Sequence, residues 1–174
     1  MDNKTLTALN GVRVGHSTHL DKLTGCTVVL FDKPYQVAYK AYGGAVGAYG
    51  TEANKADKTN YGEDGIFIAG GSNTGLMSAN EIMECLRHDQ KGSRSGKDKQ
   101  IFNPSVTGAI VYDQGMQVAP YDPAYGREAY ENANSEPIAS GNVGAGTGTS
   151  VGKFRWVESG TKTGAMKAGV GSAR

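Results

Sequence analysis

Glycine is the residue that most constrains how this chain can fold. It accounts for 26 of the 174 residues, about twice the usual share of roughly 7%. The glycines gather at 43–44, 70–71, 141–152 and 169–171, each group beside apolar or small residues. Glycine permits positive φ angles and close backbone approach, so these groups predict tight turns packed near a site. The valine, isoleucine, alanine and phenylalanine between them argue against a flexible linker.

The length and charge of the chain limit the classes of protein to which it can belong. Its 174 residues correspond to one domain of ordinary size, spanning 1–174. The net charge is +1 and opposite charges are interspersed, which leaves no basic stripe for nucleic acid. No segment resembles a membrane span of about 20 apolar residues, and residues 1–10 lack a signal-peptide core. We therefore expect a soluble, cytoplasmic protein that binds neither nucleic acid nor membrane.

Few residues have the spacing of a metal or redox site. Cys26 and Cys85 are far apart, lack a CxxC companion and lie in apolar stretches, which favours buried thiols over a disulfide or a reactive cysteine. His16 and His19 lie three positions apart, but Asp21 is the only further ligand type nearby. Surface or turn histidines are therefore favoured over a metal site.

Residue patterns predict a mixture of strands and helices. Strands are predicted at 11–15, 26–31, 35–42, 66–69, 106–112 and 117–119. Helices are predicted at 74–88, capped by Ser72 or Asn73, and from the Asp122-Pro123 pair to about residue 134. Residues 51–64 and 89–100 are almost free of apolar side chains and predict exposed loops. Because strands and helices do not alternate strictly, we expect an α+β fold or a layered αββα sandwich.

The segment 141–153 (GNVGAGTGTSVGK) has the composition of a phosphate-binding loop but not its spacing. A Walker A motif needs glycine at the position of Thr147, and Ser or Thr at that of Phe154. The dinucleotide fingerprint GxGxxG also fails, because Thr149 stands at its last glycine. Nucleotide binding is therefore disfavoured.

Two residues are candidates for a catalytic role. Tyr112 follows an apolar strand and Lys153 follows the glycine run. Taken singly, a tyrosine there is usually core with its hydroxyl at the rim, and such a lysine is usually exposed. A tyrosine hydroxyl can also donate to a developing oxyanion, and a lysine can stabilise a nucleophile. No Ser-His-Asp arrangement stands out in the sequence, so triad chemistry is disfavoured.

Seven motifs in order resemble the DmpA family, also called the P1 or S58 peptidases. They lie at 10–30, 42–47 (YGGAVG), 69–76 (AGGSNTGL), 109–115 (AIVYDQG), 122–133 (DPAYGREAYENA), 141–153 and 167–174 (KAGVGSAR). The family includes L-aminopeptidase/D-amidases, β-peptidyl aminopeptidases and endo-acting hydrolases of 6-aminohexanoate (nylon) oligomers. The resemblance spans essentially the whole chain.

The resemblance implies a self-processing amidohydrolase. The family fold is a four-layer αββα sandwich like that of Ntn hydrolases, here incomplete without a downstream β chain. The family precursor cuts itself before a Ser or Thr, which becomes the N-terminal nucleophile of that second chain. The resemblance thus implies an α chain whose αβ units assemble further, short-peptide or amide substrates, and no metal or organic cofactor.

Two site residues carry over by position. Tyr112 matches a tyrosine that lines the nylon-hydrolase site, and Lys153 matches a lysine close to the nucleophile. The family's oxyanion asparagine and nucleophile lie beyond Arg174, so Asn142 is not that asparagine. Ser172 as nucleophile is disfavoured because only two residues follow it.

Alternatives to an active subunit remain open. An end at Arg174 suggests a truncated chain, a split gene or a nick after arginine. A non-catalytic scaffold of the same fold is the main rival reading, and an aggregation-prone fragment with exposed sheet edges is a weaker one. If the substrate carries a free ammonium, Glu81 or Glu84 could hold it, although helical spacing favours neither.

Overall fold

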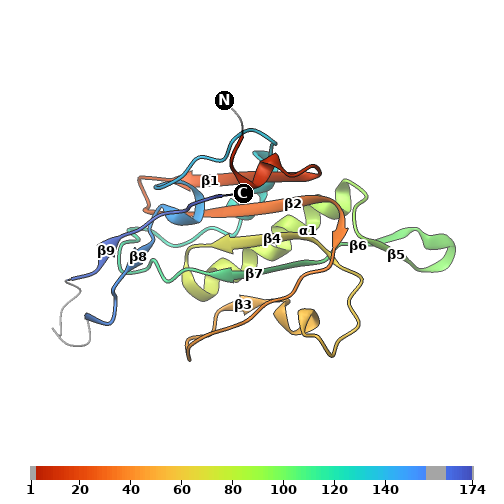
Figure 1. Cartoon of the computed structure of the whole chain (residues 1–174), viewed down its shortest axis with the longest axis horizontal. Helices are drawn as coiled ribbons and strands as arrows, with labels where there is room; N and C mark the ends of the chain where they lie inside the picture. Colours follow the sequence, from red (N-terminus) through yellow and green to blue (C-terminus); the bar gives the residue numbers. More distant parts are fainter. Residues whose placement is uncertain (1–2, 156–163, 174) are drawn as a thin grey trace.

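A five-stranded sheet forms the centre of the computed structural model, which describes residues 3–155 and 164–173 (Figure 1). Its strand order is β1-β2-β4-β7-β3. The strands are β1 (Val12–His19), β2 (Thr24–Tyr35), β4 (Glu63–Ala69), β7 (Val106–Ile110) and β3 (Ala48–Tyr49). β4 and β7 run parallel, and the other neighbours are antiparallel. The residues that follow β4 and β7 therefore leave the sheet at the same edge.

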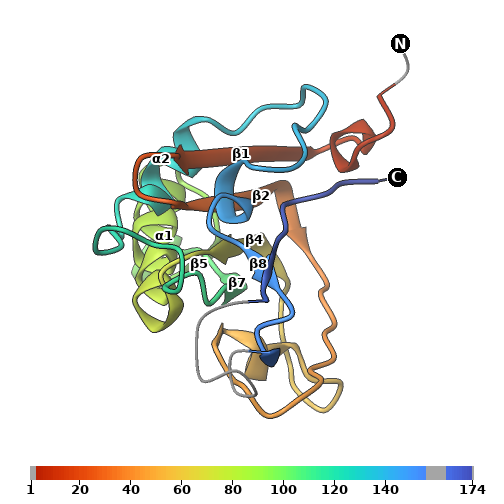
Figure 2. The same cartoon turned by 90° about the vertical axis from the view of Figure 1, so that its left-hand side faces the viewer.

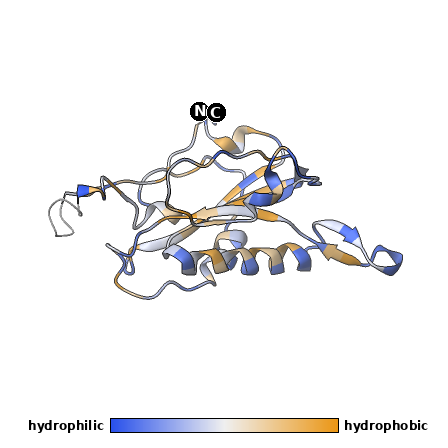
Figure 3. Cartoon of the chain, turned by 90° about the horizontal axis from the view of Figure 1, so that it is seen from below, coloured by the Kyte–Doolittle hydropathy of each residue, from blue (hydrophilic) through white to orange (hydrophobic). Residues whose placement is uncertain are grey.

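Two helices cover one face of this sheet, as Figure 2 shows. They are α1 (Ser78–His88) and α2 (Tyr125–Glu131). Side chains alternate across a strand, so every second residue of β2 and β4 points at the helices. Those residues include Val28, Leu30 and Phe67, which are at most 1% exposed and pack with Ile82 and Leu86 of α1. Figure 3 shows α1 along this side, with hydrophobic and hydrophilic positions interleaved along it.

The short elements lie in the connections. The 3-10 helices are η1 (Leu6–Ala8), η2 (Thr51–Asn54), η3 (Ser72–Met77), η4 (Lys97–Lys99) and η5 (Gly144–Gly146). β5 (Ser93–Ser95) and β6 (Ile101–Asn103) form a hairpin that projects from the sheet (Figure 1). β8 (Ser150–Val151) pairs with β9 (Met166–Lys167) near the chain end.

The opposite sheet face is covered unevenly by the described residues. Val12 and Val14 of β1 are buried there, and the segment around η5 packs on β1 and β2. Further along the sheet, Ile68 of β4 is 40% exposed and its cross-strand partner Ala109 is also exposed. An apolar surface therefore remains open on the central strands.

Several sequence predictions are confirmed and others need correction. The strands predicted at 11–15, 26–31 and 66–69 are confirmed, and the one predicted at 106–112 is confirmed but ends at Ile110. Cys26 and Cys85 are buried free thiols, as predicted. The strand predicted at 35–42 is wrong, because β2 ends at Tyr35 and residues 36–47 have no strand. None of the described strands pairs with this alternating segment, and Tyr42 is 87% exposed. Residues 117–119 are not a strand either, since they follow a turn in which Gln117 N–H donates to Asp113 O.

The helix boundaries also differ from the predictions. Ser72 and Asn73 do not cap an α-helix, because η3 precedes α1, which starts six residues later. The second helix starts at Tyr125, and the Asp122 side chain instead accepts the Ala124 N–H at 3.0 Å. The predicted loop at 51–64 contains the buried Asn54, Glu63 and Asp64. The Asn54 amide donates to Glu63 at 2.8 Å, and Asp64 accepts the Ser105 N–H at 2.8 Å.

Candidate functional site

The ends of β4 and β7 continue as paired backbone beyond the sheet. Val111 N–H donates to Ala69 O at 2.7 Å, and Ser72 N–H donates to Val111 O at 3.2 Å. The Gly70-Gly71 turn thus lies against residues 111–113. Tyr112 sits in this stretch with its side chain 44% exposed.

Asp113 is the buried centre of this region. Its side chain is fully buried, and its carboxylate accepts the Thr24 hydroxyl at 2.7 Å and the Gly71 N–H at 2.7 Å. A Cβ at Gly70 would collide with the Asp113 carboxylate and the Thr24 hydroxyl. The turn after β4 therefore needs glycine for close approach. This confirms the prediction of tight packing for Gly70-Gly71.

The glycine-rich segment closes over the same region. Its η5 turn docks on the sheet, where Gly144 N–H donates to Thr18 Oγ1 at 2.8 Å and Ala145 N–H donates to Thr27 Oγ1 at 3.0 Å. A Cβ on Gly148 would lie 2.9 Å from the Asp113 Cβ and would overlap Leu23 O. Glycine is again required by proximity. By contrast, a Cβ on Gly43 or Gly44 would meet nothing within 4 Å, so the packing predicted there is wrong.

Lys153 follows this segment and is partly buried. Its ammonium donates to the carbonyl oxygen of Ser150. Burial lowers the pKa of Lys153, and the negative charge of Asp113 opposes that shift. Lys153 therefore lies within electrostatic reach of the residue that follows Tyr112.

Some buried polar atoms on this side have no hydrogen-bond partner in the part of the chain that the structure describes. They are Ser150 Oγ, His16 Nε2 and Gln117 Nε2. Ser150 is only 6% exposed. A buried polar group without a partner costs roughly 1–3 kcal/mol.

His16 and His19 serve opposite sides of β1. His16 Nδ1 shares a hydrogen bond with Thr27 Oγ1 at 2.9 Å, whereas His19 Nε2 lies 2.8 Å from Glu128 of α2. They do not share a metal site, and both are partly buried strand residues, not the predicted surface or turn histidines.

Ser17, His19 and Glu128 form a cluster that the sequence reasoning missed. Ser17 Oγ donates to Glu128 Oε2 at 2.6 Å and lies 3.0 Å from His19 Nε2. In a catalytic triad the acid binds the imidazole nitrogen that the serine does not use. Here Glu128 and Ser17 contact the same nitrogen of His19. The cluster joins β1 to α2 and lacks the geometry of a triad.

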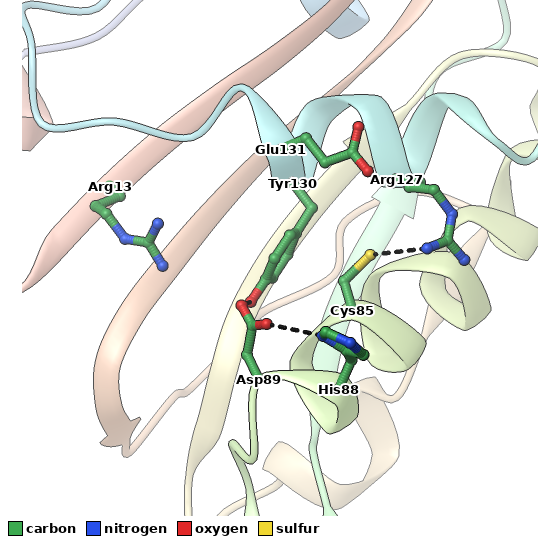
Figure 4. A pocket seen from close by; sticks show the side chains of 7 residues that line it. All are labelled: Arg13, Cys85, His88, Asp89, Arg127, Tyr130 and Glu131. Carbon is green, nitrogen blue, oxygen red and sulfur yellow. Dashed lines mark hydrogen bonds and ion pairs between the residues drawn. The ribbon is translucent and has the colours of Figure 1, made fainter.

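A cavity of about 480 Å³ lies between β1 and the two helices (Figure 4). Its lining comprises Arg13, Cys85, His88, Asp89, Arg127, Tyr130 and Glu131. Tyr130 OH donates to Asp89 at 2.8 Å, and Arg127 pairs with Glu81 at 2.8 Å. Burial raises the pKa of the Cys85 thiol, which disfavours the reactive thiolate. The cavity lies on the helix side and is a weaker candidate than the Asp113 region.

The other residues considered from sequence lie elsewhere. Glu81 pairs with Arg127, and Glu84 pairs with Arg87, both in the helix layer. Ser172 Oγ accepts the Leu6 N–H at 3.0 Å and so ties the chain end to η1. Asn142 is exposed, and Arg174 lies outside the described residues.

Asp113 is the residue that sequence reasoning overlooked. An acidic residue between Tyr112 and Gln114, followed by glycine, is typical of an exposed turn. The signal that could have indicated burial is its position directly after an apolar strand, opposite a second strand that ends in paired glycines.

The family model for peptidase family S58 matches residues 4–174. The chain belongs to peptidase family S58. One S58 relative, the 6-aminohexanoate-oligomer endohydrolase of Paenarthrobacter ureafaciens, is 31% identical over 149 residues, covering 84% of this chain and 38% of that protein. An uncharacterized aminopeptidase of Mycobacterium tuberculosis is 30% identical over 180 residues, covering 97% and 47%. The chain thus spans less than half the length of these relatives.

Two solved structures share the fold. The L-aminopeptidase D-Ala-esterase/amidase of Ochrobactrum anthropi, described as a new variant among the Ntn hydrolase fold, matches 84% of this chain and 44% of its own, with TM-score 0.58 and 20% identity. A Burkholderia sp. β-aminopeptidase matches with TM-score 0.58 and 19% identity, covering 84% and 43%. The predicted α+β, Ntn-hydrolase-like fold is confirmed. Among the described residues, no helix has the length and apolar content needed to cross a bilayer.

Proposed function

We propose that this chain is the α-chain part of an amidohydrolase that cleaves short peptides, β-peptides or nylon-type oligomers. The observation that carries the proposal is the convergence of three segments on Asp113 within a member of family S58. Those segments are the residues after β4, the residues after β7 and the glycine-rich segment. Such convergence at the shared edge of parallel strands is a common setting for a substrate site.

Tyr112 and Lys153 are the proposed site residues. Tyr112 is 44% exposed between residues whose backbone is hydrogen-bonded, so its hydroxyl can reach a substrate carbonyl and donate to the oxyanion. Lys153 is partly buried with a lowered pKa, which suits an amine that tunes a nearby nucleophile. These roles account for both residues without a metal or organic cofactor.

A second chain is proposed to supply the nucleophile. The open apolar face around Ile68 supports this, because monomeric proteins seldom leave large apolar patches uncovered. The coverage of under half of each relative is consistent with a missing partner. We propose a downstream β chain that begins with Ser or Thr after self-cleavage, within a single αβ domain that assembles into higher oligomers in the cytoplasm.

The test compares the 174-residue chain alone with the same chain followed by its natural downstream sequence. Each is assayed on alanine p-nitroanilide, a β-alanyl amide and a 6-aminohexanoate oligomer. We expect turnover only with the downstream sequence, because the nucleophile lies there. Turnover by the isolated chain would contradict the proposal.

Variants of the active form test the two residues. Tyr112→Phe and Lys153→Ala should each lower kcat/KM by about 10- to 1,000-fold. The matched control is Tyr39→Phe, at another exposed tyrosine in the segment between β2 and β3, which should leave kcat/KM unchanged. Full activity in both site variants would remove their proposed roles. A complete protein that folds and binds amides but never cleaves them would favour the non-catalytic scaffold.

A further inference from the structure

The proposed function assigns roles to Tyr112 and Lys153 but none to the carboxylate of Asp113. It is fully buried, and both of its oxygens are used. Oδ2 accepts the Thr24 hydroxyl from the first residue of β2, and Oδ1 accepts the Gly71 N–H from the turn after β4. One side chain thus joins the start of β2 to the segments that follow β4 and β7.

The backbone of Asp113 makes further ties. Its carbonyl oxygen accepts the N–H groups of Met116 and Gln117 at 2.8 and 2.9 Å. Its Cβ is so close to Gly148 that the glycine-rich segment admits no side chain there. The direction in which Tyr112 leaves the backbone is therefore fixed by contacts of the residue next to it.

The charge of Asp113 also acts on Lys153. Among the described residues, the ammonium of Lys153 donates to the carbonyl of Ser150, and the negative charge of Asp113 opposes the effect of burial on the pKa of Lys153. The charge of Asp113 also contributes to the raised pKa of Tyr121, which is 6% exposed. A buried carboxylate is costly unless hydrogen bonds and an opposite charge stabilise it.

We propose that Asp113 is the positioning residue of the candidate site: it fixes the segments around Tyr112 through hydrogen bonds, and its negative charge acts on Lys153. The inference rests on the proposed function for what the site does. The contacts of Asp113, however, all lie within this chain. They can be measured without substrate and without a second chain.

The experiment separates charge from hydrogen bonding with two variants of the 174-residue chain. Asp113→Asn removes the charge, but its amide can still accept from Gly71 and donate to the Thr24 hydroxyl. Thr24→Val removes one hydrogen bond and keeps the charge. Lysine side chains labelled with ¹³C are titrated by NMR, and the Lys153 signal is assigned by its loss in Lys153→Arg.

We expect Asp113→Asn to lower the pKa of Lys153 further, because burial then acts unopposed. Thr24→Val should leave the pKa of Lys153 unchanged while it lowers the free energy of unfolding. The matched control is Asp122→Asn, an exposed carboxylate nine positions along the chain. The pKa of Lys22 is raised mainly by its hydrogen bond to Tyr125 and to a smaller extent by the charge of Asp122. Asp122→Asn should therefore lower the pKa of Lys22 slightly and leave the pKa of Lys153 unchanged.

Hydrogen exchange of the Gly71 amide gives a second measurement if Asp113→Asn does not fold. In the unaltered chain this amide should exchange as slowly as amides of the central strands. In Thr24→Val it should exchange at least about tenfold faster, because the Asp113 carboxylate that accepts this amide loses its hydrogen bond from Thr24. An unmoved Lys153 pKa in folded Asp113→Asn, or a fast Gly71 amide in the unaltered chain, would overturn the inference. Absence of amide cleavage by the complete protein would instead count only against the proposed function.

Discussion

The two faces of the central sheet differ in how fully the described residues cover them. On one face, Phe67 and Ala69 of β4 are fully buried beneath α1 and α2. On the other, Ile68 lies between them in sequence and is 40% exposed. Neighbouring residues of one strand thus have opposite environments, because side chains alternate across a sheet.

The difference shows which part of the molecule is self-sufficient. The helix-covered face has a continuous apolar core. Among the described residues, the other face carries the docked glycine-rich segment, His16 Nε2 without a hydrogen-bond partner, and open apolar positions. The candidate site lies at the edge of the sheet where β4 and β7 end. The helix-covered face therefore supports the site, and the less covered face surrounds it.

The largest expected effect is on the covered face. Phe67→Ala should lower the free energy of unfolding of the isolated chain by about 3–5 kcal/mol, because it opens a cavity in a close-packed core. Ile68→Ala, one residue along, should lower it by less than about 1 kcal/mol, since that side chain is already partly hydrated. Urea unfolding followed by circular dichroism measures both. Equal costs would mean that the two faces are equally packed.

The glycine-rich segment allows a second comparison, between docked and free backbone. Gly148→Ala should lower the free energy of unfolding by about 1–3 kcal/mol, because its Cβ overlaps Leu23 O and crowds Asp113. Gly44→Ala, where a Cβ meets nothing within 4 Å, is the control and should change it by less than about 0.5 kcal/mol. The same urea titration checks the pair. A neutral Gly148→Ala would show that the segment is not held against the sheet.

This contrast explains what could be predicted from the sequence. Strands such as 26–31 and 66–69 were predictable because one is a run dense in β-branched residues and the other is short and fully apolar. The alternation at 35–42 was misleading, since a strand also needs a neighbouring strand, which local pattern does not reveal. The local pattern around Asp113 did not reveal its burial for the same reason. That burial depends on Thr24, Gly71 and Gly148 meeting from three distant parts of the chain.

The family motifs carried information that local pattern lacked. Position by position, they directed attention to Tyr112 and Lys153, which local pattern alone does not distinguish from rim and surface residues. They did not indicate Asp113, which stands inside the same motif as Tyr112. A motif identifies positions, whereas hydrogen bonds and burial are needed to assign what each position does.

A smaller effect is expected in the pH dependence of stability, at the start of β4. By alternation Asp64 lies on the same face as Ile68, yet it is buried and accepts the Ser105 N–H at 2.8 Å. Burial raises the pKa of Asp64 above its ordinary value of 3.8, so the folded state holds this proton more tightly than the unfolded chain. Its contribution to stability is complete below pH 3.8 and is lost as pH rises through the raised pKa.

Asp64→Asn removes that titration. The difference in free energy of unfolding between the unaltered chain and Asp64→Asn should therefore change with pH across the acidic range and become constant above it. Asp57→Asn, at an exposed carboxylate whose pKa is lowered by Lys58, is the control and should show the opposite slope. Urea midpoints at a series of pH values measure both. The same slope in both variants would show that Asp64 is hydrated, and the open face would then extend to the start of β4.

The smallest effect tests whether the covered face is held by apolar packing or by ion pairs. Glu81 of α1 pairs with Arg127 of α2, and both side chains are partly exposed. Pairs of this kind contribute about 0.2–1 kcal/mol, so Glu81→Gln should cost less than about 1 kcal/mol and less still at high salt. Glu84→Gln, which breaks a more exposed pair within α1, is the control and should cost about 0.3–0.5 kcal/mol. If Glu81→Gln lowered the free energy of unfolding as much as Phe67→Ala, the ion pair and not apolar packing would hold the two helices together. The contrast between the two sheet faces would then not be a difference in hydrophobic cover alone.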